Sequence, residues 1–258
     1  MTFKNIKVAT GAAVARITLD RPKKLNSLDE ATMIELLRAV DLVANDQTSR
    51  VMAITGAGQD LADPAMQIVD GKLPDIGTHV ERYFKPLVMK LQSLPVPSVA
   101  AVNGLAAGGG ASLALACDVV VATKSAYFLQ AFSKIGLTPD TGSTWFLTHR
   151  VGIARAMGLA LFADKLSAEK AAEWGLIWDV LEDAAFAAGV DALLERMASM
   201  PTKAMVRTRQ LMLAAAVHSL EQQLSMEATS IRELGWSQDY QEGLHAFSEK
   251  RQPTFSGS

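Results

Sequence analysis

Three consecutive glycines, Gly108 to Gly110, come directly before an apolar segment of helical character in GLAAGGGASLALACD, residues 104–118. Glycines before a helix are typical of phosphate sites, where the free N–H groups of the helix start bind an anion. A P-loop needs a lysine after its glycines and a dinucleotide fingerprint needs GxGxxG, and this stretch has neither pattern. The remaining ligand is a carbonyl oxygen that becomes an enolate, which makes the stretch a candidate oxyanion hole. The alternative is that the glycines only let the helix pack closely against a neighbouring backbone.

Asp140, in LTPDTGST, is the second residue that could do chemistry. A carboxylate in a dry pocket is a general base, and its pKa rises because burial disfavours the charged form. The same residue is equally suited to cap a helix that begins near Thr141 or Gly142. The residues alone leave both roles open. The four histidines have no metal-ligand spacing, so we expect no metal site.

The pattern of apolar residues predicts the elements that position these groups. Residues 3–10 and 13–20 predict a hairpin around Gly11, and Ser27 with Glu30 predicts a capping box at the start of a helix. Strands and helices then alternate, which is typical of an α/β core whose strands are buried on both faces. The expected elements after the first helix are strand 50–56, helix 78–94, strand 98–104, helix 108–117 and strand 118–123.

From about Leu166 the sequence becomes mostly helical, with one further strand in LIWDVL, residues 176–181. The expected helices cover residues 184–200, 202–217, 220–234 and about 238–249. An α/β core followed by a helical C-terminal section is therefore predicted.

Composition excludes several classes of protein. The 258 residues carry a formal charge of −2, whereas proteins that bind nucleic acid or membrane surfaces normally have a strong basic bias, so we expect neither partner. The uncharged run from Leu91 to Cys117 is interrupted by prolines and glycines, which favours a buried strand and helix over a membrane span. The single cysteine and an N-terminus without a signal-peptide pattern predict a cytoplasmic protein.

Several motifs, in order along nearly the whole chain, closely resemble the crotonase (enoyl-CoA hydratase/isomerase) superfamily. They are ITLDRPKKLNSLDEAT, PVPSVAAVNGLAAGGGASLALACDVVVAT, IGLTPDTGSTWFLTHRVGIARAMGLALFADKLSAEKAAEWGLIWDV and EGLHAFSEKRQPTF. Within the superfamily, AFSKIGLTPDTGSTW and ARAMGLAL are most similar to the isomerases of phenylacetate degradation. The resemblance implies an α/β spiral of ββα turns over residues 1–195, followed by a helical section, residues 196–258, that assembles homo-trimers or hexamers.

The resemblance also implies an acyl-CoA substrate and no separate cofactor. The thioester oxygen would accept hydrogen bonds from two backbone amides, which map to Gly109 and Gln59. The positions that map to substrate- and CoA-binding residues are Lys24, Leu25, Gln59, Asp60, Leu61, Gly109, Phe132 and Lys250. The basic clusters that contain Arg21 and Lys24, and Lys250 and Arg251, either meet CoA phosphates, the second from a neighbouring subunit, or form solvated faces.

Family hydratases use two glutamates, which map to Ser112 and Phe132, so neither carboxylate is present. A serine with an ordinary pKa is a poor general base, and a phenylalanine exchanges no proton. Asp140 maps instead to the acid/base of several family isomerases, and one carboxylate suffices for an allylic proton shift. We therefore predict an isomerase, with a hydratase or a catalytically silent acyl-CoA-binding oligomer as alternatives. Family dehalogenases also place an aspartate here, but with a tryptophan where Phe132 stands and a histidine for which His79 comes too early.

One loop departs from the family pattern. Family loops read G-x-x-F-x-A-G-x-D after the strand that ends ITG, whereas this chain reads ITGAGQDLAD and is several residues shorter before Gln59. Either the loop carries a true deletion, or residues are missing from the sequence between Gly56 and Gln59, and we favour the second explanation. Such a gap would separate neighbouring Cα atoms by much more than the roughly 3.8 Å of a trans peptide.

Overall fold

Two β-sheets organise the molecule, whose computed structural model describes residues 2–56, 60–61 and 75–258. The larger sheet has the strand order β1-β2-β3-β5-β7-β10. Its strands are β1 (Ile6–Ala9), β2 (Val14–Leu19), β3 (Val51–Gly56), β5 (Ser98–Val102), β7 (Val119–Thr123) and β10 (Asp179–Leu181). β1 and β2 form the expected antiparallel hairpin, and the other neighbouring strands are parallel.

The smaller sheet has the order β4-β6-β8-β9. Its strands are β4 (Asp60–Leu61), β6 (Leu105–Ala107), β8 (Tyr127–Leu129) and β9 (Leu166–Ser167). In each of the pairs β3–β4, β5–β6 and β7–β8, the first strand lies in the larger sheet and the second in the smaller sheet, and a helical segment follows. The chain therefore winds as a spiral of ββα turns. The predicted fold class is confirmed. The smaller sheet was not predicted from the sequence, because strands of two or three residues are too short to show a period.

Helix α1 (Glu30–Asn45) packs against β1 and β2. The apolar residues at helical spacing that this helix buries are Met33, Leu36, Val40 and Val43. The predicted capping box is wrong, because the N-cap is Asp29, whose carboxylate accepts a hydrogen bond from the N–H of Thr32 at 3.0 Å. Ser27 lies in the preceding turn. Both residue types cap helices well, so the sequence pattern could not separate them.

The predicted helix 78–94 consists of three consecutive segments. They are α2 (Ile76–His79), a π-helical turn (Val80–Phe84) and α3 (Lys85–Gln92). The π-helical turn buries Tyr83 and Phe84. α3 ends before Pro95, as expected of a residue that cannot continue a helix.

Helix α4 (Gly109–Leu115) is buried along its whole length and packs against α5 (Ser143–Phe162). α5 bends at Gly152, whose φ of 75° is not helical. The guanidinium of Arg150 in α5 donates hydrogen bonds to the carbonyl oxygens of Leu115 at 2.7 Å and Cys117 at 3.1 Å. α5 therefore holds the C-terminal end of α4. The remaining short helices are α6 (Ala168–Glu173) and the 3₁₀ segments Pro22–Lys24, Ala131–Ile135 and Asp183–Ala185.

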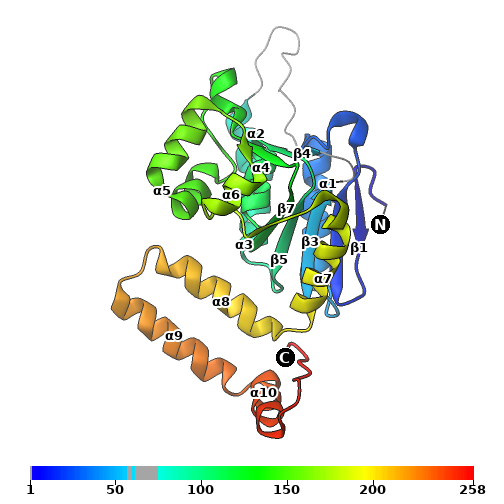
Figure 1. Ribbon diagram of the computed structural model, residues 1–258, viewed down its shortest axis with the longest axis vertical. Helices are drawn as coiled ribbons and strands as arrows, with labels where there is room; N and C mark the ends of the chain where they lie inside the picture. Colours follow the sequence, from blue (N-terminus) through cyan, green and yellow to red (C-terminus); the bar gives the residue numbers. More distant parts are fainter. Residues whose placement is uncertain (1, 57–59, 62–74) are drawn as a thin grey trace.

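Helix α7 (Phe186–Ala198) packs on the large sheet, where Val190, Leu194 and Met197 share an apolar cluster with Val51 and Val99. Figure 1 shows that the chain after α7 extends away from the two sheets as α8 (Thr202–Ala215), α9 (Leu220–Leu234) and α10 (Gln238–Glu249). The predicted boundary after residue 195 falls within α7, which stays with the core up to Ala198. The division into a core and an oligomerisation section remains a prediction.

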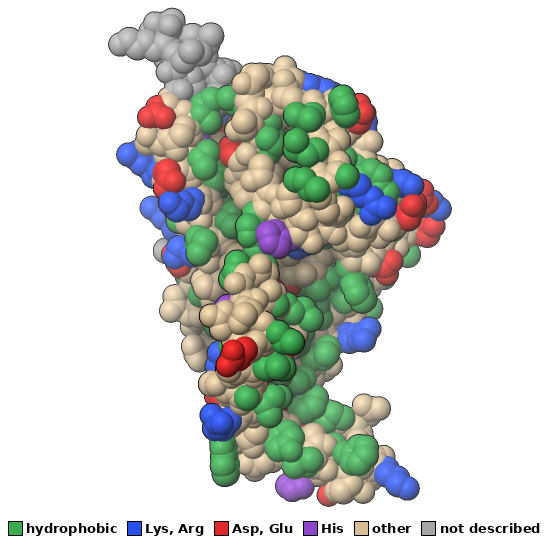
Figure 2. Space-filling view, turned by 90° about the vertical axis from the view of Figure 1, so that its left-hand side faces the viewer, with side chains coloured by type: hydrophobic (Ala, Val, Ile, Leu, Met, Phe, Trp, Pro, Cys, Tyr) green, Lys and Arg blue, Asp and Glu red, His purple; other side chains and the backbone are tan. Residues whose placement is uncertain are grey.

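A buried ion pair attaches α8 to the core. Arg209 donates to the carboxylate of Asp118 at 3.0 Å and to the backbone carbonyl oxygen of Leu94. Beyond this attachment the C-terminal helices leave large apolar side chains exposed, including Trp236 at 83% and Phe247 at 86%. Hydrophobic side chains gather over this end of the molecule in Figure 2.

Within the described ranges, no helix is both long and apolar enough to cross a membrane. The uncharged run from Leu91 to Cys117 is divided among the end of α3, two strands and α4. This division agrees with the expectation of a buried strand and helix.

Candidate active site

The glycine triplet lies where β6 ends and α4 begins. Gly108 has φ 52° and ψ −126°, and this positive φ favours glycine because a Cβ atom would be strained there. The N–H of Gly108 donates to the carbonyl oxygen of Leu129 at 2.9 Å, which fixes the turn against β8. Gly109 is the first residue of α4, and the first amides of a helix have no acceptor within the helix. The N–H of Gly109 is thus not used by the helix itself.

Asp140 lies in the turn that leads into α5. Its backbone carbonyl oxygen accepts a hydrogen bond from the N–H of Ser143 at 2.8 Å. The turn needs two consecutive positive φ angles, 54° at Thr141 and 81° at Gly142. The N-cap of α5 is Gly142, and no side chain of the described residues caps this helix. The carboxylate of Asp140 is therefore not employed as the helix cap that the sequence had left open.

The carboxyl group of Asp140 is half-buried. Burial is the dominant influence and raises the pKa of Asp140 above its ordinary value. A hydrogen bond from the hydroxyl of Thr141, at 2.8 Å, and the charge of His79 act in the opposite direction. A carboxylate with a raised pKa is a stronger base than an exposed one.

The two positions of the hydratase glutamates hold buried side chains of other types. Ser112, in the first turn of α4, is fully buried, and its hydroxyl donates to the carbonyl oxygen of Gly108 at 3.0 Å. The same hydroxyl contacts that of Ser143. Phe132, in the 3₁₀ segment before the Asp140 turn, is 6% exposed. Neither position offers a proton-transfer group to a bound substrate.

The basic residues near the N-terminal end of α1 have separate roles. Arg21 forms an ion pair with Asp29 at 2.5 Å, and its guanidinium also donates to the hydroxyl of Thr32 at 2.9 Å. Arg21 therefore stabilises the start of α1, and its contact with CoA phosphates remains a prediction. Lys24 is exposed in the adjoining 3₁₀ segment, and Leu25 follows with a φ of 52° and 56% exposure. Both remain predicted contacts of CoA.

The structure describes the remaining predicted substrate contacts to different extents. Gln59, and with it the shortened loop between Gly56 and Gln59, lies outside the described residues. The backbones of Asp60 and Leu61 pair with β6 as strand β4. Lys250 is exposed at the end of α10, far from α4 in Figure 1, and Arg251 beside it forms an ion pair with Glu242 at 2.6 Å. The CoA contact predicted for Lys250 therefore still requires a neighbouring subunit.

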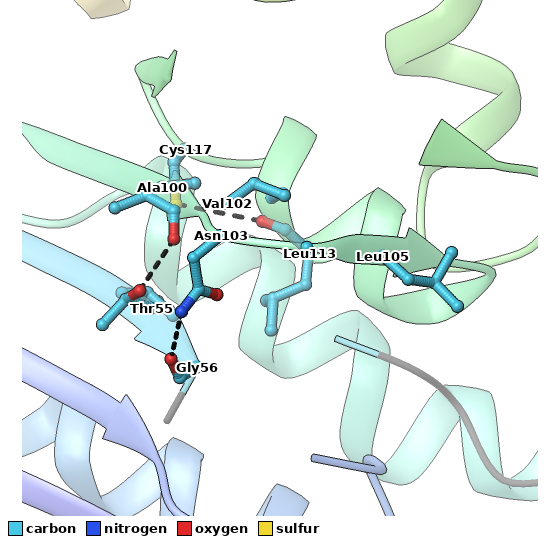
Figure 3. A pocket seen from close by; sticks show the side chains of 12 residues that line it. Thr55, Gly56, Ala100, Val102, Asn103, Leu105, Leu113 and Cys117 are labelled. Carbon is cyan, nitrogen blue, oxygen red and sulfur yellow. Dashed lines mark hydrogen bonds between the residues drawn. The ribbon is translucent and has the colours of Figure 1, made fainter. Parts of the chain in front are cut away.

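A small cavity of about 20 Å³ lies behind α4, between the ends of β3 and β5 (Figure 3). Asn103 points across it and donates from Nδ2 to the carbonyl oxygen of Gly56 at 2.7 Å. This bond holds the end of β3, from which the loop to Gln59 departs. Cys117 lines the same cavity, and burial raises the pKa of its thiol to about 12, so the thiol is not a nucleophile near neutral pH.

The sequence analysis missed three contributors to this site, namely Asn103, Gln130 and Ser143, because amides and hydroxyls carry no motif of their own. His79 was set aside as too early in the chain. In the structure it is half-buried in α2, with its ring centroid 4.9 Å from that of Tyr83, and its charge lowers the pKa of Asp140. Only the tertiary structure brings α2 towards the Asp140 turn.

Comparison with known proteins identifies the class of this fold and site. The model of the enoyl-CoA hydratase/isomerase family matches residues 9–258. The chain belongs to the enoyl-CoA hydratase/isomerase family, as the motifs indicated.

Individual relatives cover essentially the whole chain. It is 44% identical over 250 residues to the 1,2-epoxyphenylacetyl-CoA isomerase of Escherichia coli, which spans 95% of either protein. It is 42% identical over 263 residues to a probable enoyl-CoA hydratase of Rhodobacter capsulatus, which spans all of both. These relatives are named for different activities, so family membership does not decide whether the reaction is isomerisation or hydration.

Solved structures agree on the fold. An enoyl-CoA hydratase of Bacillus anthracis matches with a TM-score of 0.91 at 28% identity, over 99% of this chain and 100% of the other. An enoyl-CoA hydratase of Polaromonas matches with a TM-score of 0.89 at 27% identity, over 97% of this chain and 99% of the other.

Proposed function

We propose that this protein is an acyl-CoA isomerase that moves a double bond, or rearranges a ring epoxide, through an enolate of the thioester. Asp140 is the proton shuttle, and the amides of Gly109 and Gln59 hold the thioester oxygen. The observation that carries this proposal is the combination of a half-buried Asp140 of raised pKa with buried, non-acidic residues at both hydratase positions.

The proposed reaction needs one base that returns the proton it takes. Ionised Asp140 removes a proton from the carbon next to the double bond, and the electron pair delocalises into the thioester to give a dienolate. The oxyanion donors stabilise the negative oxygen, and losing one such donor typically slows a reaction by about 10²–10³-fold. Protonated Asp140 then delivers its proton two carbons away, which restores the carboxylate.

Hydration is less compatible with these residues. Water addition by the usual route needs one group to activate water and a second to protonate the α-carbon. The Ser112 hydroxyl is fully buried and occupied by two contacts, and Phe132 supplies no proton. Hydratase activity would therefore require a replacement acid or base.

The test uses purified protein with 3-enoyl-CoA and, separately, with 2-enoyl-CoA in water. We expect double-bond migration without accumulation of a 3-hydroxyacyl-CoA. Asp140→Asn should lower kcat for migration by at least about 10²-fold, because the shuttle is lost. Asp164→Asn, a change at an exposed aspartate, is the matched control and should leave kcat unchanged.

Other outcomes would overturn this assignment. Hydration that survives Asp140→Asn would identify a hydratase with a different acid or base. Binding of CoA thioesters with neither reaction would identify a silent acyl-CoA-binding protein, which is the outcome that the shortened loop before Gln59 favours.

The acyl group is proposed from the relatives. The name of the Escherichia coli relative supports an aromatic ring-epoxide thioester and a role in phenylacetate degradation. Comparison of kcat/KM for a ring-epoxide phenylacetyl-CoA with that for a straight-chain 3-enoyl-CoA tests this choice. A preference for the straight chain would place the protein in fatty-acid metabolism instead.

We further propose that the active form is a homo-trimer or hexamer that binds CoA through Lys24 and Leu25 of one chain and Lys250 of a neighbour. The exposed position of all three residues and the apolar surface of the C-terminal helices support this arrangement.

A further inference from the structure

Two buried hydroxyl groups connect the elements that carry the proposed oxyanion donor and the proposed base. Ser112 in α4 and Ser143 at the start of α5 are both 0% exposed, and their hydroxyls contact each other. The Ser143 oxygen also lies 3.1 Å from Oε1 of Gln130, just after β8. The three side chains therefore form one buried polar chain between α4, α5 and β8, here called the serine link.

One end of the serine link controls a particular peptide group. The hydroxyl of Ser112 donates to the carbonyl oxygen of Gly108, and the N–H of Gly109 belongs to the same peptide unit. A peptide unit is planar, and in its trans form the C=O and N–H point in opposite directions. A hydrogen bond that fixes the Gly108 oxygen therefore fixes the direction of the Gly109 N–H. The backbone N–H of Ser112 donates to the same oxygen at 3.1 Å, so the hydroxyl is a second restraint on this peptide and the one that connects it to Ser143.

The other end of the serine link controls the turn of Asp140. The backbone N–H of Ser143 donates to the carbonyl oxygen of Asp140 at 2.8 Å, so Ser143 closes this turn. Arg150 of α5 also donates hydrogen bonds to the carbonyl oxygens of Leu115 and Cys117, at the C-terminal end of α4. α4 is thus attached to α5 at both ends, and the hydroxyl contact determines the spacing at the end that faces the site.

We infer that Ser112 and Ser143 are positioning residues, whose hydroxyl contact sets the orientation of the Gly109 N–H relative to the Asp140 carboxyl group. This inference rests on the proposed function. Packing alone does not require the contact, because alanine would fill both sites without buried polar atoms, which are costly unless they are hydrogen-bonded. Ser112, which stands where hydratases carry a catalytic glutamate, thus positions the Gly109 N–H instead of transferring a proton.

The experiment compares Ser112→Ala, Ser143→Ala, the double variant and Ser112→Thr. Ser230→Ala is the matched control, since Ser230 is also a buried helical serine whose hydroxyl donates to the carbonyl oxygen four residues earlier, at 2.8 Å from Met226, but in α9. Gln130→Met weakens the same link without touching either hydroxyl. For each variant, kcat and KM for double-bond migration and the melting temperature are measured.

Misplacement by about 1 Å typically costs on the order of 10²-fold in rate. We therefore expect each alanine variant to lower kcat by about tenfold or more with KM nearly unchanged, and Ser112→Thr to recover most of the loss. The kcat of the double variant should be close to that of the less active single variant, because both changes break one shared contact. Gln130→Met should give a smaller loss in kcat, and Ser230→Ala none.

A second readout does not depend on turnover. The carbonyl stretch of a saturated, unreactive ¹³C-labelled acyl-CoA, recorded by difference infrared spectroscopy, reports hydrogen bonding to the thioester oxygen. We expect a shift to lower frequency in the wild-type protein that is reduced in Ser112→Ala and retained in Ser230→Ala. If the shift depends on Ser112 but no migration occurs, the positioning role stands and the isomerase assignment fails.

Three results would overturn the inference. Folded alanine variants with unchanged kcat and an unchanged carbonyl shift would do so while leaving the isomerase assignment intact. Fully additive losses in the double variant would show that the two serines act separately. A wild-type protein that binds no acyl-CoA would remove both proposals together.

Discussion

At the scale of the residue, the environment of Asp140 determines the expected pH dependence. Burial raises its pKa, so the ionised base is lost at a higher pH than for an exposed carboxyl group. We expect kcat/KM to fall as the pH is lowered through this raised pKa. A pH profile whose midpoint equals the ordinary value of about 4 would contradict this expectation.

The same shift has a consequence for stability. A carboxyl group whose pKa is higher in the folded than in the unfolded state binds more protons when folded, so stability falls as the pH rises through these pKa values. Ionised Asp140 therefore destabilises the fold near neutral pH, and Asp140→Asn should raise the melting temperature at pH 7 while it lowers kcat. The difference in melting temperature should shrink as the pH is lowered through the raised pKa of Asp140, because protonation removes the charge.

His79 provides a separate test of the charges at the site. The charge of His79 lowers the pKa of Asp140. His79→Ala should therefore move the acid limb of the kcat/KM profile to higher pH. His245→Ala, a change at an exposed histidine of α10, should leave the profile in place.

At the scale of the element, the turn between Asp140 and α5 depends on one glycine. Gly142 has a φ of 81°, and a Cβ atom there would lie 2.8 Å from the ring of Phe146. Gly142→Ala should lower the free energy of unfolding by about 1–3 kcal/mol, because both the backbone and the ring would be strained. It should also lower kcat, since the same turn carries Asp140.

The matched control for this change lies in the same helix. Nothing lies within 4 Å of a Cβ atom added at Gly158 in α5. Gly158→Ala should therefore raise the free energy of unfolding by about 0.5–1 kcal/mol. Denaturant unfolding of both variants measures the two effects, and equal effects would show that the Gly142 turn is not a special position.

At the scale of the whole molecule, the C-terminal helices expose more apolar surface than one folded chain requires. Trp236 and Phe247 are more than 80% exposed, and exposed apolar clusters of this kind mark protein contacts. We expect light scattering to give three or six times the mass of one chain. The double variant Trp236→Ser/Phe247→Ser should shift this mass towards the single chain, whereas Met89→Ser, at 61% exposure on α3, should not. A wild-type protein that is monomeric at all concentrations would contradict the oligomer proposal.

Local patterns were sufficient for much of the fold. The spacing of apolar residues predicted α9 to the residue and the approximate extent of α10, and the alternation of strands and helices predicted the α/β core. The motifs around Gly109 and Asp140 identified the family. Helical periods and motifs of this kind are short-range properties, so the sequence states them directly.

Contacts between distant segments were decided only by the tertiary structure. The second sheet, the pairing of Ser112 with Ser143, the bond from Asn103 to Gly56 and the charge of His79 near Asp140 all join residues that lie far apart in the sequence or in strands too short to show a period. Arg21 likewise forms an ion pair with Asp29 that the sequence did not predict. The sequence was sufficient to predict which groups could do chemistry, namely Gly109 and Asp140. Their burial, and therefore their orientation and the pKa of Asp140, depends on long-range packing that no local pattern encodes.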